Sequence, residues 1–187
     1  MNNSQIFENE INLIKNEALR RFVRHYLDNY VPEYFWHIGA SSSGKYHPIF
    51  AQGEGGLVRH TKAVVMFAQE LLRMNTYAYM DDMYKDYAIV ACICHDTCKY
   101  GIENEVDKEQ FVHHGTMAGN MMAICYSAFF DGAEIPDLLY LAVVAHMGQW
   151  SQDVRPFTPI DRLVHMADYM ASRNFIDIPA LHEVEAE

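Results

Sequence analysis

The spacing of apolar residues constrains this chain more than any other feature. Across most of the sequence they recur every three or four positions, which is the period of one face of an α-helix, and no run alternates as a half-buried strand would. We therefore predict an all-α bundle. A single domain is expected, because 187 residues, half of them hydrophobic, can enclose one sizeable core. The predicted helices cover residues 4–20, 20–29, 57–74, 86–98, 114–130, 136–147 and 158–173.

Two of these helices carry further signals. The helix predicted at 86–98 is apolar nearly all round as far as Cys94, which indicates a buried, central position. The last helix opens with Thr158 as an N-cap, Pro159 in the first turn and the carboxylate of Asp161 three residues after the cap. Gly148 follows the helix predicted at 136–147 and is expected at its C′ position, where glycine commonly ends a helix.

Histidine is unusually frequent, with ten residues, and several histidines fall on the apolar helix faces. His60, for example, lies three residues after Leu57 and four before Val64, so it shares their buried stripe. The inward-facing imidazoles and carboxylates come from five predicted helices, and they are His60, His95, Asp96, His114, His146 and Asp168.

This clustering predicts a metal centre. One buried histidine is ordinary, since it usually does no more than hydrogen-bond a carbonyl. Several unpaired imidazoles and carboxylates buried together cost about 1–3 kcal/mol each, and a divalent cation among them removes that cost. Imidazole and carboxylate ligands suit Mn, Fe, Co, Ni or Zn. Cys94 and Cys98 flank His95 and Asp96 but are expected to point away from them, so thiolate ligation is not predicted.

Charge and composition exclude several classes of function. The net charge of −11 argues against a protein that holds duplex nucleic acid by its overall field. No apolar run is long enough to span a membrane, and the polar, acidic N-terminus does not resemble a secretory signal. The four cysteines contain no C-x-x-C pair and are expected to be reduced and buried, as in a cytoplasmic protein.

Three motifs, taken in order, resemble the HD-domain metal-dependent phosphohydrolase superfamily. They are GGLVRHT at 55–61, CHDTCK at 94–99 and AD at 167–168. The resemblance extends over residues 53–173 and implies a helical HD domain at 51–175. Residues 1–50 would then be a helical segment packed on that core, and residues 176–187 a C-terminal tail. The ordered ligand set of the family falls on His60, His95, Asp96 and Asp168.

A narrower likeness concerns a second metal ion. Some members of the family carry two further histidines, which match His114 in VHHGTMAG at 112–119 and His146 in VAHMG at 144–148. The motifs YHP at 46–48, TP at 158–159 and HMAD at 165–168 are similar to the HD domain of bacterial 3′-to-5′ exoribonucleases. Those enzymes also carry an OB domain, and we expect none within these 187 residues, which one helical domain accounts for.

The resemblance implies a chemistry for these residues. Asp96 would bridge two divalent transition-metal ions, with His60, His95 and Asp168 completing one site and His114 and His146 serving the other. Lys99 would be the second catalytic residue and would offer charge to a phosphate oxygen; the alternative is a solvated lysine that favours the helix dipole. The implied function is a phosphohydrolase or phosphodiesterase that acts on a nucleotide or short oligonucleotide.

Two other functions remain open at this point. One is a non-catalytic, metal-stabilised regulatory module, and the other is a di-iron oxygenase, because the same ligands could serve either. The expected partner is a small phosphorylated substrate, and a homo-oligomer is not excluded.

Other polar and aromatic residues are expected outside the centre. His47 belongs to no cluster, and Arg59 and Lys62 are expected on the solvated surface. His165 could orient a ligand, contact substrate or simply pack. Trp150 could stack on a base but is expected to be a packing residue.

Overall fold

The computed structural model describes residues 2–41 and 47–182, and every regular element within them is a helix. The prediction of an all-α, single-domain fold is therefore confirmed. The α-helices are α1 (Glu8–Ile11), α2 (Glu17–Asn29), α3 (Tyr34–His37), α4 (Gly56–Leu72), α5 (Asp82–Cys94), α6 (His114–Phe129), α7 (Asp137–Val144) and α8 (Pro159–Ala171). Short 3₁₀ helices join them, among them η4 (Lys108–His113) and η5 (Gly148–Trp150).

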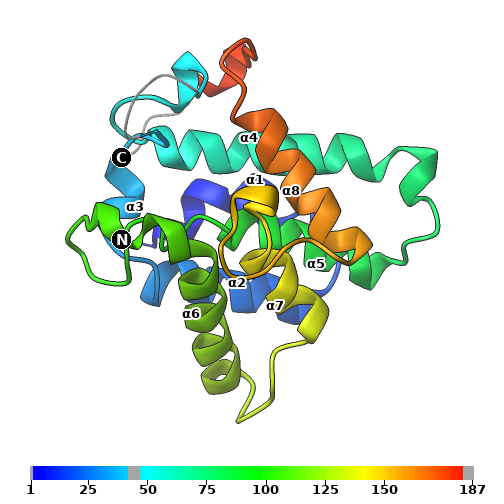
Figure 1. The fold of residues 1–187 in the computed structure, drawn as a ribbon. Helices are drawn as coiled ribbons and strands as arrows, with labels where there is room; N and C mark the ends of the chain where they lie inside the picture. The colour runs from blue at the N-terminus through cyan, green and yellow to red at the C-terminus, as the bar shows by residue number, and fades with distance from the viewer. Residues whose placement is uncertain (1, 42–46, 183–187) are drawn as a thin grey trace.

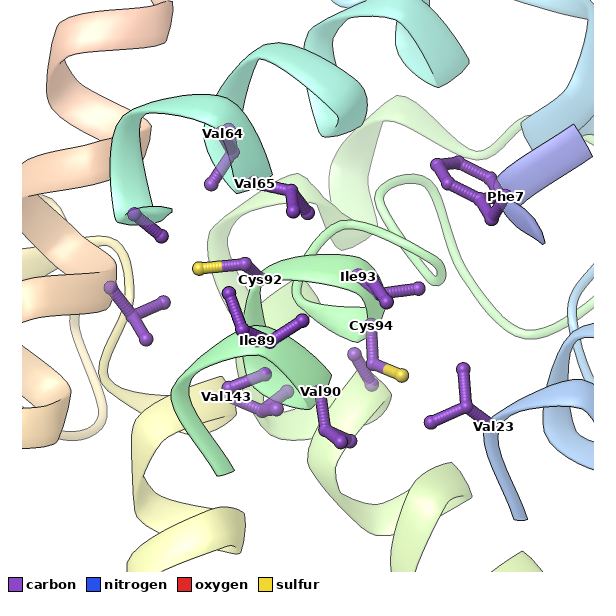
Figure 2. Packing of buried hydrophobic residues seen from close by; sticks show 14 of the residues in the cluster. Phe7, Val23, Val64, Val65, Ile89, Val90, Cys92, Ile93, Cys94 and Val143 are labelled. Carbon is purple, nitrogen blue, oxygen red and sulfur yellow. The ribbon is translucent and has the colours of Figure 1, made fainter. Parts of the chain in front are cut away.

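Helix α5 lies at the centre of the bundle, as predicted. It packs against α4, α7 and α8, and its residues 88–94 are all buried. Figure 1 shows α4 running across one side of the molecule with α8 crossing it, while α6 and α7 lie on the other side. In the core, Cys92 and Ile93 lie beside the α4 valines, and Cys94 lies on the side of Val23 from α2 (Figure 2). Because α5 is packed on every side, the position of the residues that follow it, His95 and Asp96, is also fixed.

The bounds of α5 differ from the predicted 86–98. The helix begins earlier because Asp81 caps it, accepting a hydrogen bond from the backbone amide of Tyr84 at 2.9 Å. It ends at Cys94, since the hydroxyl of Thr97 donates to the Cys94 carbonyl at 2.8 Å and the chain tightens into three-residue turns. His95 and Asp96 therefore lie in a buried turn rather than inside a helix.

The single helix predicted at residues 4–20 is broken into two. Residues 3–11 form a 3₁₀ turn and α1, and α2 starts only at Glu17. The break is held by Asp86 of α5, whose carboxylate accepts hydrogen bonds from the amides of Lys15 and Asn16, both at 2.8 Å. Asn16 then caps α2 with its side chain. The apolar periodicity of the sequence continues through the break, so the periodicity alone did not reveal where one helix ends and the next begins.

Lys62 and Arg59 of α4 do not lie on the solvated surface as predicted. Lys62 is buried; its ammonium donates to the carboxylate of Glu10 at 2.8 Å and to the Ile6 carbonyl, and it lies 5.0 Å from the Phe7 ring centre. Arg59 is half-buried and donates to backbone carbonyls between residues 50 and 54. Both cations thus attach preceding segments of chain to α4.

The start of α8 is as predicted. Thr158 accepts from the amide of Asp161 at 3.2 Å, and the Asp161 carboxylate accepts from the amide of Thr158 at 2.9 Å, which together form a capping box. Helix α7 is shorter than predicted and ends at Val144, so Gly148 is not its C′ residue. Gly148 instead adopts a positive φ of 61° in the turn that leads into η5.

Among the described residues, no helix combines the length and the apolar character needed to cross a membrane. The buried side chains of Phe7, Ile11 and Ile14 belong to the same core as α4 and α5, and so does Leu181 near the C-terminus. The domain limits at residues 50 and 175 stay predictions.

Candidate metal centre

The fold brings all six predicted ligand residues to one place. His60 lies on α4, His95 and Asp96 follow α5, His114 opens α6, His146 follows α7, and Asp168 lies on α8. Five of the side chains are buried, and that of Asp168 is 20% exposed. Because three helices (α4, α6 and α8) and the turns that follow α5 and α7 supply these groups, the packing of the bundle itself sets their positions.

One group of side chains gathers around Asp168 and the Oδ2 atom of Asp96. The Nε2 atom of His60 lies 3.1 Å from Asp168 Oδ1 and 3.7 Å from Asp96 Oδ2. The Nε2 atom of His95 lies 3.6 Å from Asp96 Oδ2 and 3.9 Å from Asp168 Oδ1. Two imidazole nitrogens and two carboxylate oxygens therefore converge.

A second group gathers around the other oxygen of Asp96. His114 Nε2 lies 2.9 Å and His146 Nε2 3.5 Å from Asp96 Oδ1, and the two nitrogens are 2.9 Å apart. The two oxygens of a single carboxylate thus face different pairs of histidines.

Backbone carbonyls orient three of these histidines in the same way. The Nδ1 atom of His95 bonds the Cys92 carbonyl at 2.8 Å, and that of His146 bonds the Val143 carbonyl at 2.7 Å. His114 Nδ1 bonds the Phe111 carbonyl. A carbonyl only accepts, so each Nδ1 carries the proton and each Nε2 presents a lone pair to the centre.

These lone pairs test whether the residues fit a metal ion. The Nε2 atoms of His60 and His95 are buried without a hydrogen-bond partner. Those of His114 and His146 lie 2.9 Å apart, so two neutral rings that both carry their proton on Nδ1 set one lone pair against the other. Such an arrangement is unfavourable in a protein interior unless a cation lies within it. His60, His95 and Asp168 form one cluster with metal-ligand spacing, and His95, Asp96 and His146 form another. The residues fit a divalent metal, and no cysteine belongs to either of these clusters.

The electrostatics favour the ligand forms of Asp96 and His95 at neutral pH. Burial acts to raise the pKa of Asp96, but the Lys99 ammonium and the neighbouring imidazoles outweigh it and hold that pKa well below its usual range. Burial lowers the pKa of His95 to about 4. Asp96 is therefore a carboxylate and His95 a neutral imidazole, the forms in which both bind metals. For His146, burial acts to lower the pKa, but the hydrogen bond and the charge of Asp96 outweigh it and raise that pKa.

Lys99 is buried beside Asp96. Its ammonium lies 2.5 Å from Asp96 Oδ2, and this carboxylate outweighs the effect of burial and raises the pKa of Lys99. The side chain also borders the pocket described next. The alternative considered from the sequence, a solvated Lys99, is therefore wrong.

A pocket of about 530 Å³ opens onto the centre. Its buried end is lined by Asp96, Lys99, His114 and His146, with Asp168 beside them. The remaining lining residues are His47, Phe111, Met147, Trp150, Tyr169, Ser172 and Arg173. The volume is in the range of small-molecule sites.

Sequence reasoning missed His47. Its ring lies 5.1 Å from that of His60, it borders the pocket, and its Nδ1 atom is buried without a partner. Burial lowers the pKa of His47 to about 3, so the ring is neutral. Only the YHP motif pointed to this position, and Tyr46 of that motif lies outside the described residues.

The structure also places the residues whose roles were left open. His165 bonds the backbone carbonyl of His146 at 2.8 Å through Nδ1, so it supports the segment that carries a predicted ligand. His113, next to His114 in the chain, is exposed, and its Nδ1 atom lies 3.1 Å from Oδ1 of Asp153. Trp150 borders the pocket and is half exposed, so it is not a buried packing residue.

Comparison with known proteins identifies the family. Residues 57–173 match the family model of the HD domain, a span that includes all six converging residues. No curated protein and no solved structure matches the chain. The HD domain is found mostly in metal-dependent phosphohydrolases, and the match covers more than half of the sequence. The fold, the converging histidines and aspartates, and this match lead to one conclusion: the chain belongs to the HD domain family.

Proposed function

We propose that this protein is a metal-dependent phosphohydrolase or phosphodiesterase with two metal sites joined by Asp96. The observation that carries the proposal is the division of one carboxylate between two pairs of histidines. A carboxylate that served a single ion would not need a second pair of imidazoles at its other oxygen. Paired metal sites are a recurring arrangement in phosphoester hydrolysis.

The proposed ligands follow that division. His60, His95 and Asp168 would hold one ion together with Asp96 Oδ2. His114 and His146 would hold the other with Asp96 Oδ1. Mn, Fe, Co, Ni and Zn all suit such nitrogen and oxygen ligands. When bound, these ions supply a water of lowered pKa and neutralise charge on the phosphate oxygens.

The residues of the chain would supply the rest of the chemistry. In hydrolysis the oxygen of water forms a bond to phosphorus, the ester P–O bond breaks, and the alcohol leaves with a proton. Lys99, buried at the pocket wall and held by Asp96, would direct its positive charge to a non-bridging phosphate oxygen. The backbone bonds of His95, His114 and His146 would keep their Nε2 atoms in place, which limits reorganisation during the reaction.

The proposed substrate is a nucleotide or a short oligonucleotide. A pocket of about 530 Å³ has room for a small phosphorylated molecule, whereas a net charge of −11 disfavours the binding of a duplex by the overall field of the protein. The substrate would therefore be recognised locally, at the pocket.

A panel of phosphoesters tests the proposal. Protein reconstituted with Mn would be assayed on bis-p-nitrophenyl phosphate, nucleoside monophosphates, cyclic nucleotides and dinucleotides. Hydrolysis of at least one, lost after chelation and restored by Mn, is expected. A protein that holds metal but is inert across the panel would instead be a non-catalytic metal-binding module. Oxygen consumption by an iron-loaded sample would indicate oxygenase chemistry.

A further inference from the structure

The exposed part of the pocket has an aromatic wall. The rings of Trp150 and Tyr169 are nearly parallel, with an interplanar angle of 8° and centres 5.8 Å apart. Both residues line the pocket, and Trp150 is 51% exposed. A flat indole left open on the wall of a binding pocket is apolar surface that a planar ligand can cover.

The segment that carries Trp150 is tied to the metal centre. Trp150 ends η5, four residues after His146, and the His146 carbonyl bonds His165 of α8 at 2.8 Å. A side chain at Gly148 would come within 2.1 Å of the His165 ring, so the turn and α8 are in close contact. The packing of this turn against α8 therefore fixes the position of Trp150 relative to His146.

Arg173 completes the wall. Its guanidinium carbon lies 4.2 Å from the centre of the Tyr169 ring, and its nitrogens donate to the Tyr169 carbonyl and the Ser172 hydroxyl at 3.1 and 3.2 Å. Among the described residues that line the pocket, Lys99 and Arg173 are the only lysine or arginine. Lys99 is already bonded to Asp96, so Arg173 is the cation at the exposed end.

We propose that Trp150, supported by Tyr169 and Arg173, forms the subsite for the base of a nucleotide whose phosphate lies at the ligand residues. This inference deepens the proposed function and depends on it for the placement of the phosphate. Stacking on an open aromatic face recognises a base without reading its edge, and it contributes about 1–3 kcal/mol per base when the aromatic residue is replaced by alanine. The subsite should therefore discriminate strongly between a nucleotide and the same sugar phosphate without a base. It should discriminate only weakly between nucleotides with different bases.

The test compares two ligands that differ only in the base. They are the 5′-phosphonate analogues of adenosine monophosphate and of ribose 5-phosphate, in which a methylene group replaces the ester oxygen and prevents hydrolysis. Their binding to the Mn-loaded protein would be measured by titration calorimetry. The wild-type protein should bind the adenosine compound at least about fivefold more tightly than the ribose compound.

Substitutions then assign the difference to Trp150. Trp150→Ala should remove most of the preference for the adenosine compound and leave the affinity for the ribose compound unchanged, while Trp150→Phe should retain the preference. Phe157→Ala removes an aromatic side chain that is more exposed and does not line this pocket, so it should change neither affinity. Far-UV circular dichroism checks that each variant is folded.

The outcomes separate this inference from the proposed function. Equal affinities for the two compounds in the wild-type protein, or an equal loss of both in Trp150→Ala, would overturn the base subsite even if hydrolysis is observed. A base-dependent affinity that Trp150→Ala abolishes would support the subsite even if no phosphoester is turned over.

Discussion

The Nε2 atom of His114 lies 2.9 Å from Oδ1 of Asp96, on the opposite side of the carboxylate from Lys99, which bonds Oδ2. His114 opens α6 and Asp96 follows α5, so this contact joins two elements that meet at the pocket. Both oxygens of the Asp96 carboxylate are consequently in contact with a polar side chain. Any change at Asp96 should affect both groups of histidines at once.

Removal of the Asp96 carboxylate should therefore abolish both proposed metal sites. Asp96→Ala is expected to lose bound metal and to reduce hydrolysis by at least about 100-fold. Elemental analysis and a phosphoester assay on the same sample check this. Asp177→Ala, which removes an exposed carboxylate paired with His182, is the control and should match the wild-type protein. An Asp96→Ala variant with full metal content and full activity would refute the assignment.

Gly148 should matter because of what lies beside it. Alanine there needs a positive φ and places Cβ within 2.1 Å of His165, which bonds the carbonyl of His146. We expect Gly148→Ala to lower metal affinity about tenfold. Gly132→Ala is the matched control, because Gly132 also has a positive φ, of 89°, but open space around it, and so bears the backbone strain alone. Equal metal affinity in the two variants would show that the contact with His165 is not needed.

The metal-free protein should lose stability as the pH falls from 6.5 to about 4. His95 has a folded-state pKa of about 4 against a usual value of 6.5, so in this window the unfolded chain binds a proton that the folded chain does not. For this fully buried group the difference in pKa corresponds to a loss of about 3 kcal/mol in the free energy of unfolding across this pH window. His146, whose pKa is raised, acts in the opposite sense, so a variant is needed to isolate His95.

Urea unfolding after chelation, measured at several pH values, checks this. In His95→Asn the loss of stability between pH 6.5 and 4 should be clearly smaller than in the unsubstituted protein. An identical pH dependence in both would contradict the pKa given to His95.

Lys62 should be a major determinant of how residues 2–14 pack. Lys62→Met leaves the carboxylate of Glu10 without its buried partner and is expected to lower the free energy of unfolding by about 3 kcal/mol. The control is Lys15→Met, which breaks an exposed pair with Asp82 and should leave the urea midpoint nearly unchanged. If the two variants have the same midpoint, the buried pair does not stabilise this contact.

The sequence predicted which imidazoles and carboxylates converge, because the signals are local. His60 and Asp168 lie on helices whose apolar periodicity shows which face is buried, and the HD pair follows the most apolar helix. The capping box of α8 was predicted for the same reason, since Thr158 and Asp161 are close in the chain. The pattern of residues within one helix therefore predicts well which face is buried and where the helix begins.

Features that depend on distant contacts were not predictable. The partner of Lys62 is Glu10, 52 residues away, and nothing around Lys62 in the sequence distinguishes it from a surface lysine. The break before α2 depends on Asp86, 70 residues or more from the amides it binds. His47 lies in a loop, where no periodicity indicates burial. Each of these positions is decided by tertiary structure.

The number of metal ions per chain tests the central claim most directly. The protein would be purified without a chelator or a histidine tag, reconstituted with Mn, and analysed for metal content beside the His114→Ala and His146→Ala variants. We predict about two ions per chain in the unsubstituted protein and about one in each variant. No bound metal after reconstitution, or an unchanged content in both variants, would contradict an Asp96 carboxylate shared between two metal sites.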